Sequence, residues 1–163
     1  MQPSSEELIE RFYTSFKNRD PEGMTAYYVD DAIFRDSAFG SLAGEEVRNM
    51  WRMLIELGGE SLHISYRIIE ANDSTGIAAW TADYLFPQTG RKIRNEVVAH
   101  FEFREGKIVR HIDTFSFWKW SQQAFGPVGF VLGWTPLMRW ICQRQSRKQL
   151  AEFSRKRADR AST

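Results

Sequence analysis

Residues 92–118, KIRNEVVAHFEFREGKIVRHIDTFSFW, decide the fold class of this 163-residue chain. Apolar and polar side chains alternate through 92–103 and again through 107–118, and the short turn REG separates the two runs. A period of two residues predicts strands, and so short a turn predicts that they pair as an antiparallel hairpin. Two further alternating runs, 62–70 and 76–86, come before it and extend the hairpin into a four-stranded antiparallel meander.

Helical spacing dominates the residues before this sheet. Ser4 and Glu7 form a capping-box pair ahead of apolar residues at helical intervals, which predicts a helix over 4–18. The other elements expected before residue 62 are helices over 21–28 and 45–57 and a strand over 32–36. This order predicts an α+β fold, in which N-terminal helices cover one face of a curved antiparallel sheet.

Residues 119–163 extend the domain formed by residues 1–118. The extension begins with an apolar segment rich in Gly and Pro, expected as a loop, and continues as a basic helix over about 137–157. Residues 139–160 hold eight Arg and Lys against two acidic residues, a net charge of +6. We expect a lid over a pocket or a layer packed on a partner subunit. The alternative is a peripheral membrane anchor, because a basic helix after an apolar loop is typical of such anchors.

Composition limits the classes of protein and of partner that remain possible. Cys142 is the single cysteine, which excludes an internal disulfide framework and a cysteine-rich zinc site. The N-terminus MQPSSEELIE does not read as a signal peptide, and no apolar run reaches the ~18 residues that a membrane span needs. We therefore expect a cytoplasmic protein. Without a recognised motif, nucleic acid is not an expected partner. The 12 Phe, 6 Trp and 5 Tyr favour a pocket or an oligomer, with an aromatic-rich core as the alternative, and we expect a homodimer.

The order of elements resembles the nuclear-transport-factor-2-like superfamily, and within it the SnoaL-like and ketosteroid-isomerase-like branch. The resemblance is carried by FYTSFKNRDPEGMTAYYVDDAIFRDSAFG (12–40), LAGEEVRNMW (42–51) and VVAHFEFREGKIVRHIDTF (97–115). It implies a conical half-barrel of the cystatin-like type, closed by helices around a mostly apolar pocket. The superfamily includes isomerases, polyketide cyclases, dehydratases, epoxide hydrolases and non-catalytic binding modules, so the fold alone selects no activity.

The resemblance also implies roles for single residues. Ketosteroid isomerase uses an aspartate as its base, with a tyrosine and a protonated aspartate as the oxyanion hole. The base falls on Asp36 here, whereas the two oxyanion-hole groups fall on Phe12 and Ala99. Tyr13 adjoins Phe12 but is turned by ~100° around the helix. Because the loss of one such donor typically costs a rate factor of about 10²–10³, we do not expect steroid isomerisation by that mechanism.

The last predicted strand supplies acid and base groups of its own. Val109, His111, Asp113, Phe115 and Phe117 alternate along it and are expected on one face. Same-face neighbours lie ~6.5–7 Å apart, so one substrate atom or water could contact both His111 and Asp113. A histidine titrates near neutral pH, which suits proton transfer.

We therefore expect Asp36 as the base, with His111 and Asp113 as acid and orienting group. Each has a structural alternative that the sequence leaves open. His111 could be a core histidine bonded to a backbone carbonyl, and Asp113 could form an ion pair with Arg110 or Arg94. Asp36 could cap the following turn through an Asx hydrogen bond.

The side chains expected to line the pocket share an inward face on the predicted helices and strands. They are Phe12, Tyr13, Phe16, Phe34, Trp51, Leu54, Asn95, Val97, Ala99 and Phe115. The three histidines lack zinc-type spacing and no nucleotide-binding fingerprint appears, so neither a metal nor a cofactor is expected.

Two functions remain open for a protein that binds a small apolar molecule. One is a cofactor-free isomerase, cyclase or dehydratase acting on a small polycyclic or ketone-bearing substrate. The other is a non-catalytic ligand-binding or scaffold module, which includes a protein peripheral to a membrane.

Overall fold

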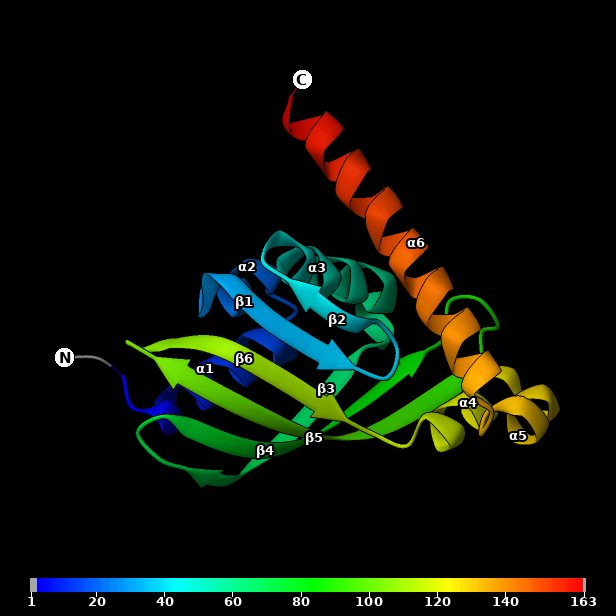
Figure 1. The fold of residues 1–163 in the computed structure, drawn as a ribbon, viewed down its shortest axis with the longest axis horizontal. Coiled ribbons are helices and arrows are strands. Elements are labelled where there is room, and N and C mark those ends of the chain that lie inside the picture. The colour runs from blue at the N-terminus through cyan, green and yellow to red at the C-terminus, as the bar shows by residue number, and fades with distance from the viewer. Residues whose placement is uncertain (1–2, 163) are drawn as a thin grey trace.

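A computed structural model describes residues 3–162, and its six-stranded curved sheet is covered by helices (Figure 1). The strands lie in the order β2-β1-β6-β5-β4-β3. In chain order the elements are α1 (Ser5–Lys17), α2 (Pro21–Thr25), β1 (Tyr28–Asp36), β2 (Gly40–Ala43), α3 (Glu45–Gly58), the 3-10 turn η1 (Gly59–Ser61), β3 (His63–Ala71), β4 (Thr75–Leu85), β5 (Lys92–Arg104), β6 (Lys107–Thr114), α4 (Phe117–Phe125), α5 (Pro127–Leu132) and α6 (Pro136–Ala161). The predicted α+β class is confirmed.

The caps expected from the sequence begin the first helix. The Ser4 hydroxyl accepts a hydrogen bond from the Glu7 amide at 3.2 Å, and the Glu7 carboxylate accepts one from the Ser4 amide at 3.0 Å. This reciprocal pair is a capping box, which satisfies two backbone donors that a helix start leaves free. The buried face of α1 places Leu8, Ile9 and Phe12 in the core.

Strands β3 to β6 form the predicted antiparallel meander. Glu105 and Gly106 both adopt a positive φ in the turn between β5 and β6, as a two-residue hairpin turn of type I′ requires. A bulge at Val109 then shifts the register of β6. Glu102 pairs with Arg110 and the next residue of β5, Phe103, pairs with Ile108. The sequence predicts that Val109 lies on the same face as His111. Because of the bulge, Ile108 is buried on that face instead, so the prediction for Val109 is wrong.

Strand β1 departs from the purely antiparallel sheet that the sequence predicts. It begins at Tyr28 rather than residue 32, and it lies parallel to β6, with Phe34 opposite His111. Its other neighbour is β2, formed by residues expected as a turn. Parallel partners are joined by long connections, so no local turn in the sequence indicates the pairing of β1 with β6.

The chain after Asp113 corrects two further expectations. Strand β6 ends at Thr114, and the Ser116 hydroxyl accepts from the Lys119 amide, so that Phe117 begins a helix rather than ending a strand. The apolar segment expected as a loop forms the short helices α4 and α5. Among the described residues, no helix combines the length and apolarity that crossing a membrane requires.

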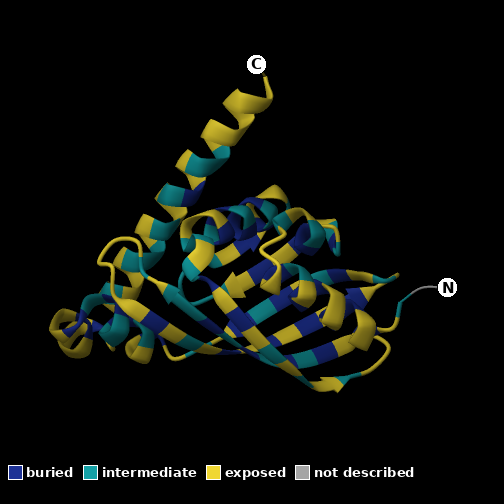
Figure 2. Cartoon of the chain, turned by 180° about the vertical axis from the view of Figure 1, so that it is seen from behind, coloured by how far each residue is buried: buried dark blue, intermediate teal, exposed yellow. Residues whose placement is uncertain are grey.

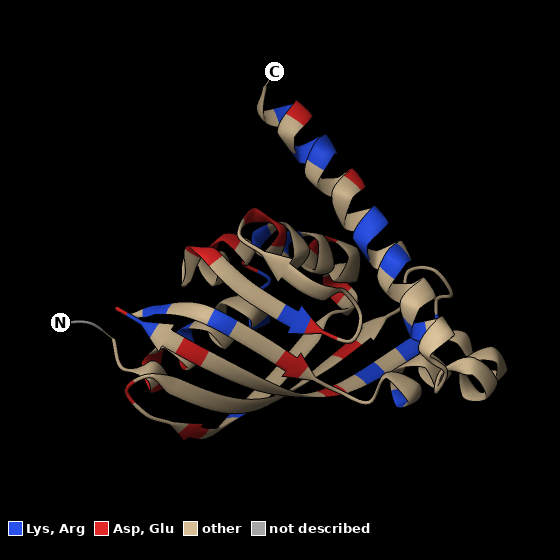
Figure 3. Ribbon diagram, in the orientation of Figure 1, with Lys and Arg blue, Asp and Glu red and all other residues tan. Residues whose placement is uncertain are grey.

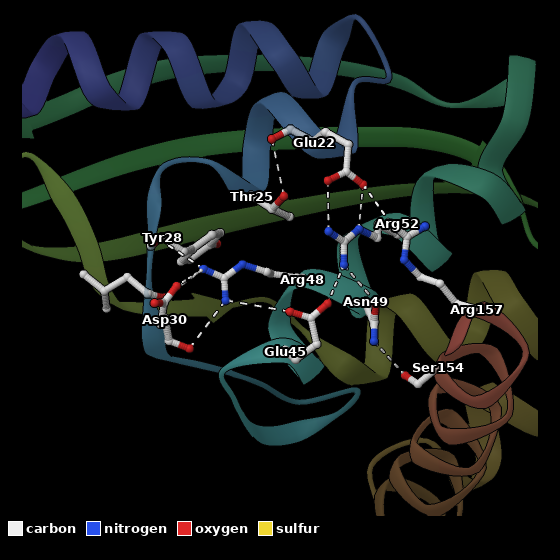
Figure 4. A network of polar contacts seen from close by, with 11 residues as sticks. Glu22, Thr25, Tyr28, Asp30, Glu45, Arg48, Asn49, Arg52, Ser154 and Arg157 are labelled. Atoms are coloured by element: carbon white, nitrogen blue, oxygen red, sulfur yellow. Dashed lines mark hydrogen bonds and ion pairs between the residues drawn. The ribbon is translucent and has the colours of Figure 1, made fainter. Parts of the chain in front are cut away.

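Helix α6 is held to the body by a network of polar contacts (Figure 4). Asn49 of α3 donates a hydrogen bond to the Ser154 hydroxyl at 3.1 Å. Glu22 of α2 forms ion pairs with Arg52 of α3 at 2.7 Å and with Arg157 of α6 at 3.4 Å. Beyond these contacts the C-terminal end of α6 extends away from the sheet and helices (Figure 1).

Candidate functional site

The structure contains a mostly apolar, partly open cavity of about 180 Å³ between the sheet, α3, α4 and α6. This volume accommodates a small organic molecule rather than a single water. The aromatic side chains in its lining are Phe16, Phe34, Phe39, Trp51, Trp80, Tyr84, Phe86, Phe115, Trp120 and Phe125. Few polar groups interrupt this surface, and an apolar pocket with a small number of convergent polar groups is typical of a ligand site.

Asp36 lies at the end of β1 and lines the cavity. Its Oδ1 accepts hydrogen bonds from the backbone amides of Ala38 at 2.9 Å and Phe39 at 2.6 Å. Burial raises the pKa of this carboxyl to about 7, and the neighbouring Asp113 carboxylate adds to the rise, against the lowering effect of the two amides. Asp36 therefore both caps the turn and presents a carboxyl group that titrates near neutral pH.

Asp113 is the second carboxylate of the cavity lining and belongs to a buried network. Its Oδ1 accepts from Nε2 of His111 at 2.9 Å and from Nε1 of Trp80 at 3.3 Å. The expected gap between His111 and Asp113, wide enough for a bridging water, is thus closed by a direct hydrogen bond. The ion pairs considered for Asp113 do not form, since Arg110 pairs with Glu102 and Arg94 with Asp83.

His111 is fully buried and is not part of the cavity lining. Its Nδ1 lies 2.7 Å from the Tyr28 hydroxyl, which also accepts from Nε1 of Trp51 at 3.0 Å. Burial raises the pKa of Tyr28 well above its usual value, so the hydroxyl stays protonated and donates a hydrogen bond to Nδ1. Nε2 of His111 then carries the hydrogen that Asp113 accepts. The network orients Asp113 and uses both ring nitrogens, so His111 is placed to position Asp113 and not to contact a ligand.

Tyr84 of β4 is a polar lining residue that the sequence analysis did not select. Its hydroxyl oxygen accepts from Nε1 of Trp120 at 3.0 Å, which leaves its own hydrogen available to a ligand. Burial raises the pKa of Tyr84, and the nearby Asp36 carboxylate adds to the rise against the hydrogen bond from Trp120. The alternation of Trp80, Ala82 and Tyr84 along β4 was the signal available in the sequence, because all three line the cavity.

Seven of the ten predicted pocket residues line the cavity, and three do not. The seven are Phe16, Phe34, Trp51, Leu54, Asn95, Val97 and Phe115. Phe12, Tyr13 and Ala99 are buried in the core outside the lining, so the expectation is corrected for these three. The reason is depth, because the Phe12 ring contacts Trp51, Phe101 and His111 and is covered by the layer that forms the cavity wall.

Tyr13 is the predicted pocket residue beside Phe12, and its hydroxyl has no hydrogen-bond partner among the described residues. Its ring stacks on Tyr66 with centroids 4.9 Å apart. Burial raises the pKa of Tyr13 well above its usual value, with Asp113 and Tyr28 adding to the rise. Tyr13 is therefore a neutral core phenol, separated from the cavity that Tyr84 faces.

No group of three or more His, Cys, Asp or Glu within residues 3–162 could hold a metal ion. The two remaining histidines, His63 and His100, lie on the exposed surface. The polar side chains that line the cavity are the two carboxyl groups of Asp36 and Asp113, the Tyr84 phenol and the side chains of Gln88, Asn95, Cys142, Gln145, Ser146 and Gln149.

Comparison with known families and structures agrees with the fold. The family model described as SnoaL-like domain matches residues 9–111. No curated protein matches the chain in sequence.

Solved structures share the fold at low identity. An LEH-like epoxide hydrolase of M. tuberculosis is 18% identical with a TM-score of 0.58, covering 77% of this chain and 93% of its own. A hypothetical protein of Catenulispora acidiphila with a ketosteroid isomerase-like fold, in complex with trimethylamine, is 16% identical with a TM-score of 0.63, covering 83% and 100%. TerC co-crystallised with polyporic acid is 22% identical with a TM-score of 0.55, covering 67% and 88%.

Proposed function

We propose, from the premise that this chain belongs to the SnoaL-like domain family, that its cavity binds a small apolar molecule and catalyses cofactor-free proton transfer on it. The observation that carries the proposal is the set of groups facing one apolar cavity: Asp36, Asp113 and Tyr84. The pKa of Asp36 is raised to about 7 there. An acid or base acts most efficiently when its pKa lies near the working pH.

The proposed roles follow from which atoms remain free. Both backbone amides bind Oδ1 of Asp36, and no described residue bonds to its Oδ2, so Oδ2 takes a proton from a carbon next to a carbonyl. The Tyr84 hydroxyl donates to the carbonyl oxygen and stabilises the enolate that forms. Return of the proton from Asp36 to another atom completes an isomerisation, and the same enolate serves an aldol-type cyclisation or a dehydration.

Asp113, with its positioning residue His111, has a supporting role in this proposal. Its carboxylate helps to raise the pKa of Asp36, which keeps that group close to half protonated near pH 7. His111 and Trp80 both bind its Oδ1 and leave Oδ2 without a hydrogen bond among the described residues. Oδ2 can therefore accept a hydrogen bond from a polar group of the ligand.

The structural neighbours support this ligand class without extending to the reaction. One carries polyporic acid and another is described as an epoxide hydrolase. At 22% and 18% identity, these likenesses establish the fold, and the activity is our proposal. A homodimer in the cytoplasm belongs to the same proposal and rests on the composition described above.

Hydrogen exchange of a ketone tests the proposed chemistry. We expect the protein to accelerate exchange of the α-protons of 2-tetralone in deuterated buffer, followed by NMR. Asp36→Asn should lower the accelerated rate by about 10²–10⁴, and Tyr84→Phe by about 10²–10³. Asp31→Asn is the matched control, because Asp31 is an exposed carboxylate on the same strand, and its rate should equal that of the wild type.

The non-catalytic binding module is the second candidate, and one observation favours it. Oδ1 of Asp36 is already used by the turn, so this aspartate has a structural reason to be present. If 2-tetralone binds with equal affinity to the wild type and to Asp36→Asn, while neither accelerates exchange, the binding module replaces the enzyme as the proposed function.

A further inference from the structure

The end of the molecule formed by α4, α5 and the start of α6 exposes an unusual number of large apolar side chains. We call this surface the apolar tip. It consists of Trp118, Val128, Phe130, Val131, Leu132, Trp134, Leu137, Trp140 and Ile141, and Trp134 is 71% exposed. Most of α5 has the yellow colour of exposed residues in Figure 2. Contiguous apolar surface of this kind on a protein marks an interaction site.

Helix α5 is packed with its small residues inward and its large residues outward. Gly129 and Gly133 are buried, and a Cβ atom at either position would collide with Ser121 of α4. The Ser121 hydroxyl donates to the carbonyls of Trp118 and Gly129, at 2.8 and 3.2 Å, and fixes the two helices together. Close packing thus uses the glycine face of α5, and its Val, Phe and Leu side chains are left pointing to solvent.

The segment that carries the apolar tip holds positive charges and no acidic residue. Residues 114–151 contain no Asp or Glu but hold Lys119, Arg139, Arg144, Arg147 and Lys148. The uncharged segment 120–138 lies between two of these cations, and Figure 3 shows no acidic segment on α4 or α5. Arg139 and Arg144 lie over the Phe117 and Trp140 rings, at 5.6 and 5.4 Å, which places positive charge at the border of the tip.

We propose that the apolar tip docks on an anionic phospholipid bilayer. Tryptophans prefer the boundary between headgroups and acyl chains, apolar side chains insert below it, and the bordering cations bind anionic headgroups. A second copy of this chain fits the tip less well. A two-fold contact would place Lys119, Arg139 and Arg144 against the same cations of the partner, with no carboxylate nearby in the sequence to compensate.

Docking would hold the cavity beside the bilayer, because the two features share α4 and α6. Trp120 and Cys142 line the cavity, while their close neighbours Trp118 and Ile141 belong to the tip. An apolar ligand concentrated in the membrane would then lie close to the helices that cover the cavity.

Vesicle flotation tests the proposal with the full chain. We expect binding to vesicles of phosphatidylcholine mixed with phosphatidylglycerol, weaker binding to phosphatidylcholine alone, and a loss of affinity as salt rises. Phe130→Ser with Trp134→Ser should lower the partition coefficient at least about tenfold, because each side chain leaves the apolar phase. The matched control is Ile33→Thr with Ile69→Thr, which removes two exposed apolar side chains from the sheet and should leave binding unchanged.

A second pair of variants tests the charges. Lys119→Gln with Arg144→Gln should weaken binding to the anionic vesicles, whereas Lys156→Gln with Arg160→Gln should not. The second pair lies roughly 25 Å or more along α6 from Arg139, beyond the reach of screened surface charge.

Three results would overturn the proposal. The first is no binding of the wild type to either vesicle, which needs no variant. The second is equal binding by the tip variant and its control, with circular dichroism showing both folded. The third is a wild type that forms a dimer in solution and does not bind vesicles, while Phe130→Ser with Trp134→Ser is monomeric. That result would show that the tip contacts a second copy of the chain.

Discussion

Asp36 shows that a single carboxyl group can serve a turn and a cavity together. The sequence offered a choice between an Asx cap and a catalytic base. The cap is observed, because Oδ1 accepts from the amides of Ala38 and Phe39. The same side chain also lines the cavity. The two interpretations use different oxygens of one carboxylate, and for that reason the cap does not exclude the proposed base.

The raised pKa of Asp36 predicts a pH-dependent stability difference. Its folded-state value of about 7 exceeds the ordinary 3.8, so between these values the folded state binds more protons than the unfolded state. Its contribution to stability is complete below pH ~4 and is lost as pH rises through ~7. Asp36→Asn should therefore be more stable than the wild type by roughly 2–4 kcal/mol above pH 7, and about equal to it near pH 4.

Urea unfolding at several pH values measures this difference, with Asp31→Asn as the exposed control. Asn can still accept the two backbone hydrogen bonds through its side-chain oxygen, so the cap is retained. A difference that stays constant from pH 4 to pH 8 would contradict the raised pKa.

At the scale of elements, the parallel pairing of β1 with β6 creates the buried network. It sets Tyr28 opposite Ile108 and Phe34 opposite His111, which brings the Tyr28 hydroxyl to 2.7 Å from the imidazole. Helix α3 adds Trp51, whose Nε1 donates to the same hydroxyl. Side chains from β1, α3 and β6 therefore form one network, and the partner of Nδ1 is a side chain rather than the backbone carbonyl that the sequence left open as an alternative.

Tyr28→Phe tests this network. The variant leaves Nδ1 of His111 and Nε1 of Trp51 without their hydrogen-bond partner in a buried region. Because a buried polar group left unpaired costs about 1–3 kcal/mol, the free energy of unfolding should fall by roughly 2–4 kcal/mol in urea titration. Tyr27→Phe, at the preceding half-buried position, is the control and should change stability by less than about 0.5 kcal/mol. An equal effect of both changes would show that the hydroxyl of Tyr28 is not stabilising.

At the scale of the whole molecule, α6 forms part of the cavity wall and is attached mainly by polar contacts. Cys142, Ser146 and Gln149 face the cavity from α6, which agrees with the lid expected from the sequence. Leu150 is the one fully buried side chain among the described residues of this helix. The half-buried Phe153 also packs on the core, and the other attachments are polar. They include the contacts of Ser154 and Arg157 in Figure 4, the hydrogen bond from Gln143 to the Ser37 carbonyl at 3.1 Å, and those from Arg147 to the carbonyls of Phe39 and Ser41 at 3.3 and 2.8 Å. An element with little buried apolar surface is expected to open locally before the molecule unfolds.

Leu150→Ala is the change that should release the lid. The lost packing should lower the stability of the helix attachment by about 2–4 kcal/mol. We expect hydrogen–deuterium exchange to rise along 142–157 while exchange in β3 to β6 stays unchanged. Leu137→Ala, an exposed leucine on the same helix, is the control. Faster exchange throughout the sheet would indicate global unfolding and would contradict a separately opening lid.

Local patterns in the sequence determined most of the elements and the family. Alternation predicted β3 to β6, the Ser4 and Glu7 pair predicted the start of α1, and the order of elements predicted the SnoaL-like family, which is confirmed. These signals are readable because a period or a cap depends on residues only a few positions apart. Helix α4 was not predicted, although Ser116 is a residue type that favours the N-cap position and does cap this helix.

The tertiary structure decided which of the predicted inward-facing side chains reach the cavity, and it decided their hydrogen-bond partners. Phe12 and Phe16 share the buried face of α1, yet only Phe16 reaches the cavity. Tyr84 shares a face of β4 with Trp80 and Ala82, but only the packing of α4 shows that its hydroxyl accepts from Trp120. Depth within a core and contact between distant elements depend on how layers stack and which strands become neighbours. Periodicity gives the face of an element but not what covers that face.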